Sequence, residues 1–156
     1  MWQALYDELK QKNFTVVAVA MDSRPEASRQ WIEAAKSTYP CVIDRSHRVA
    51  ELYNMVNVPQ SVWIDEAGRI VRPTESAGAV DSFRSMDRKT FAMSPEATAI
   101  RTRARETYLN ALRDWVAKGP ASEFAYDRKA AAAHLKLPTP EIALANANFR
   151  LGQYLY

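Results

Sequence analysis

The feature that most constrains the fold is a short apolar run at residues 14–20 (FTVVAVA), which follows a helix-like segment directly. The run is continuously apolar and rich in β-branched residues, a pattern typical of a strand buried on both faces and hence of a parallel sheet. Residues 2–12 place Trp2, Leu5 and Leu9 on one side of a helix, opposite a charged face. The sequence therefore begins as an alternation of helix and strand and predicts an α/β fold.

The alternation continues along the next stretch. Ser23 and Pro25 supply a cap and a first turn for a helix over residues 25–37, whose buried side is expected to carry Trp31, Ile32 and Ala35. A short strand at 41–44 and a helix at 46–53 follow, and the helix is expected to bury Val49, Leu52 and Tyr53.

Two further strands are predicted at residues 60–65 and 69–72, joined by a four-residue turn at 65–68 that ends in Gly68. A glycine at this place suits a turn that needs a positive φ, so the two strands form an antiparallel hairpin.

A different architecture begins after the hairpin. Periodicity fades between Pro73 and Met93, which indicates a connection. A strong helix then opens at Ser94 and Pro95 and ends at Gly119. Its apolar stripe consists of Ile100, Ala104, Tyr108, Ala111, Leu112, Trp115 and Val116. A short helix at 130–135 and a last helix from residue 139 complete the chain.

These patterns divide the chain into residues 1–73, a linker at 74–93 and a helical extension at 94–156. An apolar content of 47% and a charged content of 25% are those of a globular protein. The sequence contains no apolar run long enough to span a membrane and no secretory signal, so we predict no membrane association, and the compartment stays undetermined.

Two segments, residues 4–22 and 39–73, resemble the redoxin and TlpA-like thiol-disulfide oxidoreductases of the AhpC/TSA type. The shared features are a helix leading to a parallel strand, an inserted αβα segment, a Val-Pro before a strand, and a hairpin with Asp-x-x-Gly. The resemblance implies an incomplete thioredoxin-like fold, with parallel strands, an antiparallel hairpin and flanking helices, followed by an α-helical C-terminal region.

The resemblance also implies a candidate substrate-binding loop at Val58, Pro59 and Gln60. In this family the Val-Pro pair forms a cis-proline loop beside the redox cysteines, where backbone groups can pair with an extended substrate. The alternative is a proline that merely starts a strand. The partner implied for the full-length form is a protein thiol or disulfide, or a peroxide.

The chain departs from the family in its cysteines, because it lacks the first strand and the Cys-x-x-Cys motif. Cys41 is the single cysteine, so no CxxC pair or multi-cysteine zinc site can form within one chain. We interpret Cys41 as a small buried apolar residue and assign no catalytic residue. His47 and His134 lack partners at ligand spacing, so we propose no metal and no cofactor.

The remaining notable residues have ordinary interpretations. Arg101, Arg103 and Arg105 diverge around a helix and predict a solvated face, so no nucleic acid is expected as a partner. The four tryptophans are expected to pack in the core, and they are Trp2, Trp31, Trp63 and Trp115. The last helix resembles the first helix of a tetratricopeptide-type hairpin.

The resemblance implies that the missing strand would lie between those at 14–20 and 60–65, which leaves two edges unpaired. The edges could close on each other, another chain could pair with them, or the sequence could be truncated; we expect truncation, because the last helix also ends without a cap. A homodimer through the strand edges or the C-terminal helix is a further expectation. Two functions follow: a thiol-disulfide or peroxide reductase that is inactive as this chain, or a redox-dead binding or assembly module.

Overall fold

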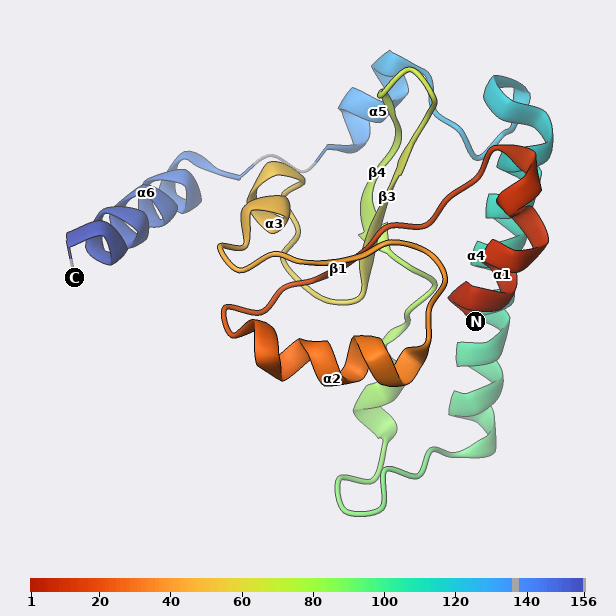
Figure 1. The fold of residues 1–156 in the computed structure, drawn as a ribbon, viewed down its shortest axis with the longest axis horizontal. Helices are drawn as coiled ribbons and strands as arrows, with labels where there is room; N and C mark the ends of the chain where they lie inside the picture. Colours follow the sequence, from red (N-terminus) through yellow and green to blue (C-terminus); the bar gives the residue numbers. More distant parts are fainter. Residues whose placement is uncertain (136–137, 156) are drawn as a thin grey trace.

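The computed structural model of the chain describes residues 1–135 and 138–155, and it has the expected α/β architecture with a helical C-terminal region (Figure 1). Four strands and six α-helices are described: α1 (Trp2–Leu9), β1 (Ala18–Ala20), α2 (Pro25–Ala35), β2 (Cys41–Ile43), α3 (Arg48–Leu52), β3 (Gln60–Ile64), β4 (Ile70–Ser76), α4 (Pro95–Lys118), α5 (Arg128–His134) and α6 (Pro140–Leu155). Three 3₁₀ turns, η1 (Lys10–Lys12), η2 (Asp81–Ser85) and η3 (Gly119–Ala121), join them.

The strands form two separate sheets of two strands each. β1 pairs with β2 in parallel, with Ala18 opposite Cys41. β3 pairs with β4 in an antiparallel hairpin, with Trp63 opposite Arg72. The parallel strands and the hairpin predicted from the sequence are confirmed. Within the described residues β1 does not pair with β3, so these two edges have not closed on each other.

The predicted burial of the first strand is wrong. Only Ala18 to Ala20 of the run at 14–20 form a strand, none of these three residues is fully buried, and Val17 is exposed. The physical reason is the width of the sheet, because two short strands offer too little surface for helices to cover both faces.

The same narrow sheet explains the errors in α2 and α3. Trp31 was expected in the core, but 72% of its surface is exposed. Ala35 is exposed as well, and Ile32 is only half-buried. In α3, Leu52 is exposed. Helical periodicity identifies the apolar side of a helix correctly, but that side is buried only where a neighbouring surface exists to receive it.

The hairpin turn forms as predicted. Gly68 has a φ of 75°, and Asp65 Oδ1 accepts hydrogen bonds from the backbone N–H groups of Ala67 (3.0 Å) and Arg69 (2.9 Å). β4 is longer than expected, because it continues past the predicted end at Arg72 to Ser76. The turn could be predicted from its own residues, whereas the continuation of β4 to Ser76 depends on pairing with β3.

The core lies between α1, β3 and α4. Its buried members come from all three elements and from the turn after β4: Leu5, Leu9, Trp63, Ala77, Tyr108, Ala111 and Leu112. Trp2 and Trp115 pack against this cluster while partly buried, so core packing is confirmed for three of the four tryptophans. An ion pair between Arg113 and Glu8 (2.8 Å) fastens α4 to α1 at the surface. In the stripe predicted for α4, Ile100 is the exception, because it is exposed.

The division into residues 1–73, 74–93 and 94–156 stays a prediction. The core cluster contains residues from both sides of the predicted linker, since Leu9 and Trp63 precede the linker and Tyr108 follows it. α6, in contrast, lies away from α1 and α4 at the far end of the molecule (Figure 1).

Candidate substrate-binding loop

Two of the predicted substrate-binding residues, Val58 and Pro59, lie in an exposed loop between α3 and β3, and the third, Gln60, is the half-buried first residue of β3. Val58 is 67% exposed, and the peptide bond between Val58 and Pro59 is cis. The side chain of Gln60 folds back on the loop, where its Oε1 accepts hydrogen bonds from the backbone N–H groups of Val56 (2.9 Å) and Asn57 (3.2 Å). Gln60 therefore holds the shape of the loop. The substrate role of these residues stays a prediction.

A small hollow of about 90 Å³ adjoins the loop. The loop supplies one side of it, and the segment after β4 supplies the other. The lining residues are Asn57, Val58, Pro59, Ser76, Ala79, Val80 and Asp81. The backbone N–H of Ala77 points to the carbonyl of Pro59 at 3.5 Å. The far wall of the hollow thus comes from residues that the sequence had indicated to be a linker.

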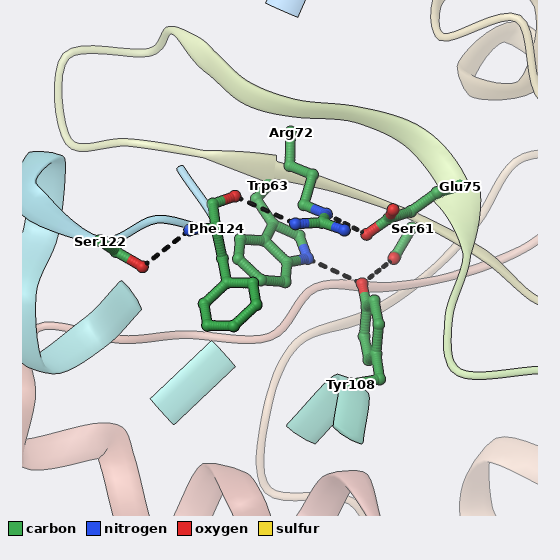
Figure 2. Close-up of polar contacts among 7 residues, drawn as sticks. All are labelled: Ser61, Trp63, Arg72, Glu75, Tyr108, Ser122 and Phe124. Atoms are coloured by element: carbon green, nitrogen blue, oxygen red, sulfur yellow. Dashed lines mark hydrogen bonds and ion pairs between the residues drawn. The ribbon is translucent and has the colours of Figure 1, made fainter. Parts of the chain in front are cut away.

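Beneath the loop, Tyr108 of α4 connects two residues of β3 through its hydroxyl group. Trp63 Nε1 donates a hydrogen bond to Tyr108 Oη (2.7 Å), and Tyr108 Oη also shares a short hydrogen bond with Ser61 Oγ (Figure 2). Burial raises the pKa of Tyr108, against the lowering effect of these two hydrogen bonds. The hydroxyl therefore stays protonated and serves as a structural link from α4 to the strand that begins at the loop.

Arg72 of β4 connects the hairpin to the segment after α4. Its Nε donates to Glu75 (2.5 Å) and its Nη1 donates to the backbone carbonyl of Phe124 (3.1 Å), as Figure 2 shows. The guanidinium also lies over the rings of Trp63, 5.0 Å from the centroid, and Tyr126, at 5.4 Å. Burial lowers the pKa of Arg72, but the hydrogen bond and ion pair with Glu75 outweigh that effect and raise it.

The sequence analysis did not predict these hydrogen bonds. Tyr108 was expected only as one member of an apolar stripe, and Arg72 only as the end of a strand. The hydrogen bonds join residues about 45 positions apart, namely Trp63 to Tyr108. No local pattern reports such a pairing, because it depends on how α4 packs against β3. The tyrosine hydroxyl within an apolar stripe was the one available signal.

Cys41 lies in β2 and is half-buried. Its Sγ is 3.7 Å from the backbone carbonyl of Tyr39, which it faces as a weak donor. Its location in a strand agrees with the sequence analysis, which expected no helix N-terminus beside it. Its role in the protein stays untested.

The other predicted residues are dispersed. His47 is exposed at the start of α3, and His134 stacks on Tyr126 at the end of α5. Among the described residues no group of acidic, histidine or cysteine side chains could hold a metal ion. Within the same residues, no helix is long and apolar enough to cross a membrane.

Comparison with known proteins supports the resemblance. The model of the AhpC/TSA family matches residues 1–72. The thiol-disulfide oxidoreductase ResA of Oceanobacillus iheyensis is 30% identical over 79 residues, which cover 51% of this chain and 41% of that protein. The chain thus spans less than half of the relative's length. No solved structure shows a significant match.

The helix-strand order, the hairpin and the family match agree with one another over the first half of the chain. Residues 1–72 are therefore similar to the AhpC/TSA family, and the chain is similar over 79 residues to a thiol-disulfide oxidoreductase.

Proposed function

We propose that the protein acts in thiol-disulfide exchange, reducing protein disulfides or peroxides, with its substrate docking at Val58, Pro59 and Gln60. The observation that carries this proposal is the exposed loop beside a hollow, because the loop lies within the segment that matches the AhpC/TSA family. An extended polypeptide could pair with the exposed loop backbone while one of its small side chains enters the hollow.

The chemistry of such exchange requires two thiols. A cysteine thiolate attacks one sulfur of the substrate disulfide, a new S–S bond forms, and the other substrate sulfur leaves as a thiolate. A second thiol then attacks the mixed disulfide, which releases the reduced substrate and leaves the two attacking thiols oxidised to a disulfide. The chain contains Cys41 alone, so one copy of it cannot complete both steps. We therefore propose that the chain by itself is inactive.

An insulin-disulfide reduction assay tests this proposal. The 156-residue chain is compared with a version extended upstream of Met1 to any in-frame Cys-x-x-Cys. Activity is expected in the extended version only, and Pro59→Ala in that version is expected to slow reduction of the protein disulfide. Pro138→Ala, at an exposed position away from the loop, is the matched control. Inactivity of both versions would reject the reductase.

A redox-dead binding or assembly module is the second candidate. The observation that favours it is the placement of Cys41, half-buried in a strand with its sulfur against a backbone carbonyl. Such a module would hold a protein partner through the loop or the unpaired edges of β1 and β3. Partner binding by the 156-residue chain with Cys41→Ser tests this candidate. A binding module keeps its partner without any thiol, and loss of the partner from this thiol-free chain would reject the module.

A further inference from the structure

A groove of about 490 Å³ lies along α4. α4 contributes six of its lining residues, namely Ile100, Arg103, Ala104, Thr107, Tyr108 and Ala111, and the others are Arg72, Gly78 and Phe124. A volume of this size accommodates a substantial apolar group. Ile100 is exposed here, so the groove is open at one end.

α6 is the counterpart of this groove, because it is a helix whose apolar side chains have no covering surface. Its large apolar residues are all exposed: Ile142, Leu144, Phe149, Leu151, Tyr154 and Leu155. An ion pair of Arg150 with Glu51 joins α6 to α3. Exposed apolar patches of this extent mark interaction sites.

We propose that α6 of one copy docks into the α4 groove of a second copy, and that the exchange is reciprocal. The groove and the helix are then two halves of one interface between identical chains. This interface is independent of the function proposed for the loop.

The spacing of side chains supports this match. On α6, Ile142 and Phe149 lie seven residues apart on one side of the helix. In the groove, Ala104 and Ala111 also lie seven residues apart. Seven residues correspond to about 10.5 Å along a helix. The two large side chains of α6 can therefore sit over the two small residues of α4, in the manner of knobs packing into holes, whichever direction the helices run.

The charges are complementary as well. Arg103 lines the groove, and Arg72, which is paired with Glu75 of its own chain, lines it as well. Among the described residues, no carboxylate side chain lines the groove. α6 carries a single acidic residue, Glu141, directly beside Ile142. Its single basic residue, Arg150, already pairs with Glu51 of its own chain. Docking of Ile142 would bring Glu141 to the basic edge of the groove, where charge attraction favours the correct register.

The buried area explains why the exchange should be reciprocal. One helix contact made through two large side chains buries on the order of 600 Å², counting both surfaces. A stable interface needs roughly 1,200 Å². A two-fold symmetric pair contains two copies of the contact and reaches this value.

Sedimentation velocity of the full chain over a wide concentration range tests the proposal. We expect a monomer-dimer equilibrium. Phe149→Asp on α6 and Ala104→Glu in the groove should each weaken the dimer at least about tenfold. The matched controls are Asn148→Asp, on a side of α6 turned away from Ile142 and Phe149, and Thr102→Glu on the opposite side of α4, and both should leave the dimer unchanged. Circular dichroism checks that each variant is folded; if Ala104→Glu unfolds, Thr107→Glu at the exposed groove edge replaces it.

Mixing the two variants gives the decisive result. The Phe149→Asp chain keeps an intact groove and the Ala104→Glu chain keeps an intact α6, so one contact can form between them. Native mass spectrometry should detect a heterodimer in the mixture that is more abundant than either variant's own dimer. A chain that stays monomeric at all concentrations overturns the proposal. A dimer that Ala104→Glu leaves unchanged also overturns it, because α6 would then pair directly with α6.

Discussion

The two sheets of the molecule lie in contrasting surroundings. The hairpin of β3 and β4 packs with α1 and α4 around a buried cluster that includes Leu5, Trp63 and Tyr108. The parallel pair of β1 and β2 has no such core, because no described side chain in residues 10–62 is fully buried. One half of the fold is therefore held by side-chain packing, and the other is held chiefly by backbone hydrogen bonds and half-buried contacts.

This difference indicates where the stability of the chain resides. Burial of apolar surface is the dominant favourable contribution to folding, so the α1, β3 and α4 region should unfold last. The β1 and β2 region should open locally at lower free energy. Residues 1–72, which match the AhpC/TSA family, include the less stable β1 and β2 region. Much of the core comes from α4, which lies outside the matched residues.

The largest expected difference in the free energy of unfolding is between substitutions of two tryptophans. Trp63 is 3% exposed in the core, whereas Trp31 is exposed on α2. Trp63→Ala should lower the free energy of unfolding by about 4 kcal/mol, through lost burial and a cavity. Trp31→Ala should change it by less than roughly 0.5 kcal/mol. Urea unfolding measures both, and similar losses for the two variants would show that α2 is packed as tightly as the core.

Gly78 tests how closely the turn after β4 approaches α4. Its φ is +70°, and an added Cβ would lie 3.0 Å from Tyr108 Cβ and 3.2 Å from Arg105 Cα. Gly78→Ala should therefore cost about 2 kcal/mol from backbone strain and crowding together. Gly68 has a φ of +75° but open space around it, so Gly68→Ala should cost about 1 kcal/mol from strain alone. Equal thermal shifts for the two variants would contradict the close packing at Gly78.

Loss of the Tyr108 hydroxyl should lower the stability of the same region by less than either change above at Trp63 or Gly78. Tyr108→Phe removes the partner of the Trp63 indole N–H and of the Ser61 hydroxyl, and should cost about 1.5 kcal/mol. Tyr39→Phe is the matched control, because the Tyr39 hydroxyl makes no hydrogen bond with another described residue. Chemical denaturation with tryptophan fluorescence as the signal measures both. A neutral Tyr108→Phe would mean that packing of the ring alone holds α4 against β3.

The smallest expected effect is the contribution of the Asp44 carboxylate to the local stability of α3, which belongs to the half of the fold without a buried core. Burial raises the pKa of Asp44, but hydrogen bonds from the backbone N–H groups of Arg48, Val49 and Ser46 outweigh it, and the pKa is lowered. A carboxyl group with a lowered pKa contributes stability above its ordinary pKa of about 3.9, and this contribution is lost as the pH falls through the lowered value.

Hydrogen exchange of the α3 amides measures this contribution. Protection at α3 should be lost at low pH before protection at α4, and Asp44→Asn should abolish the pH dependence at α3. Loss of protection at both helices at one pH would mean that the two halves open together.

Local sequence signals predicted the elements but not their burial. The hairpin turn at Asp65 and Gly68 and the cap at Ser94 formed as expected, since each depends on residues a few positions apart. The exposed loop at Val58 was placed by its resemblance to a family and not by any local pattern. The far wall of its hollow, at Ser76 and Asp81, could not be predicted, because it depends on the path of the chain after β4.

The sequence by itself determined which segments are helices and strands, because periodicity, caps and turn residues act over a few positions. It also determined that one copy of the chain cannot carry a pair of redox cysteines. Only the tertiary structure decided that Trp63 is buried and Trp31 exposed, and that Tyr108 supports the strand below the loop. The physical reason is that burial requires a partner surface, and a partner surface is created by contacts between residues far apart in the sequence.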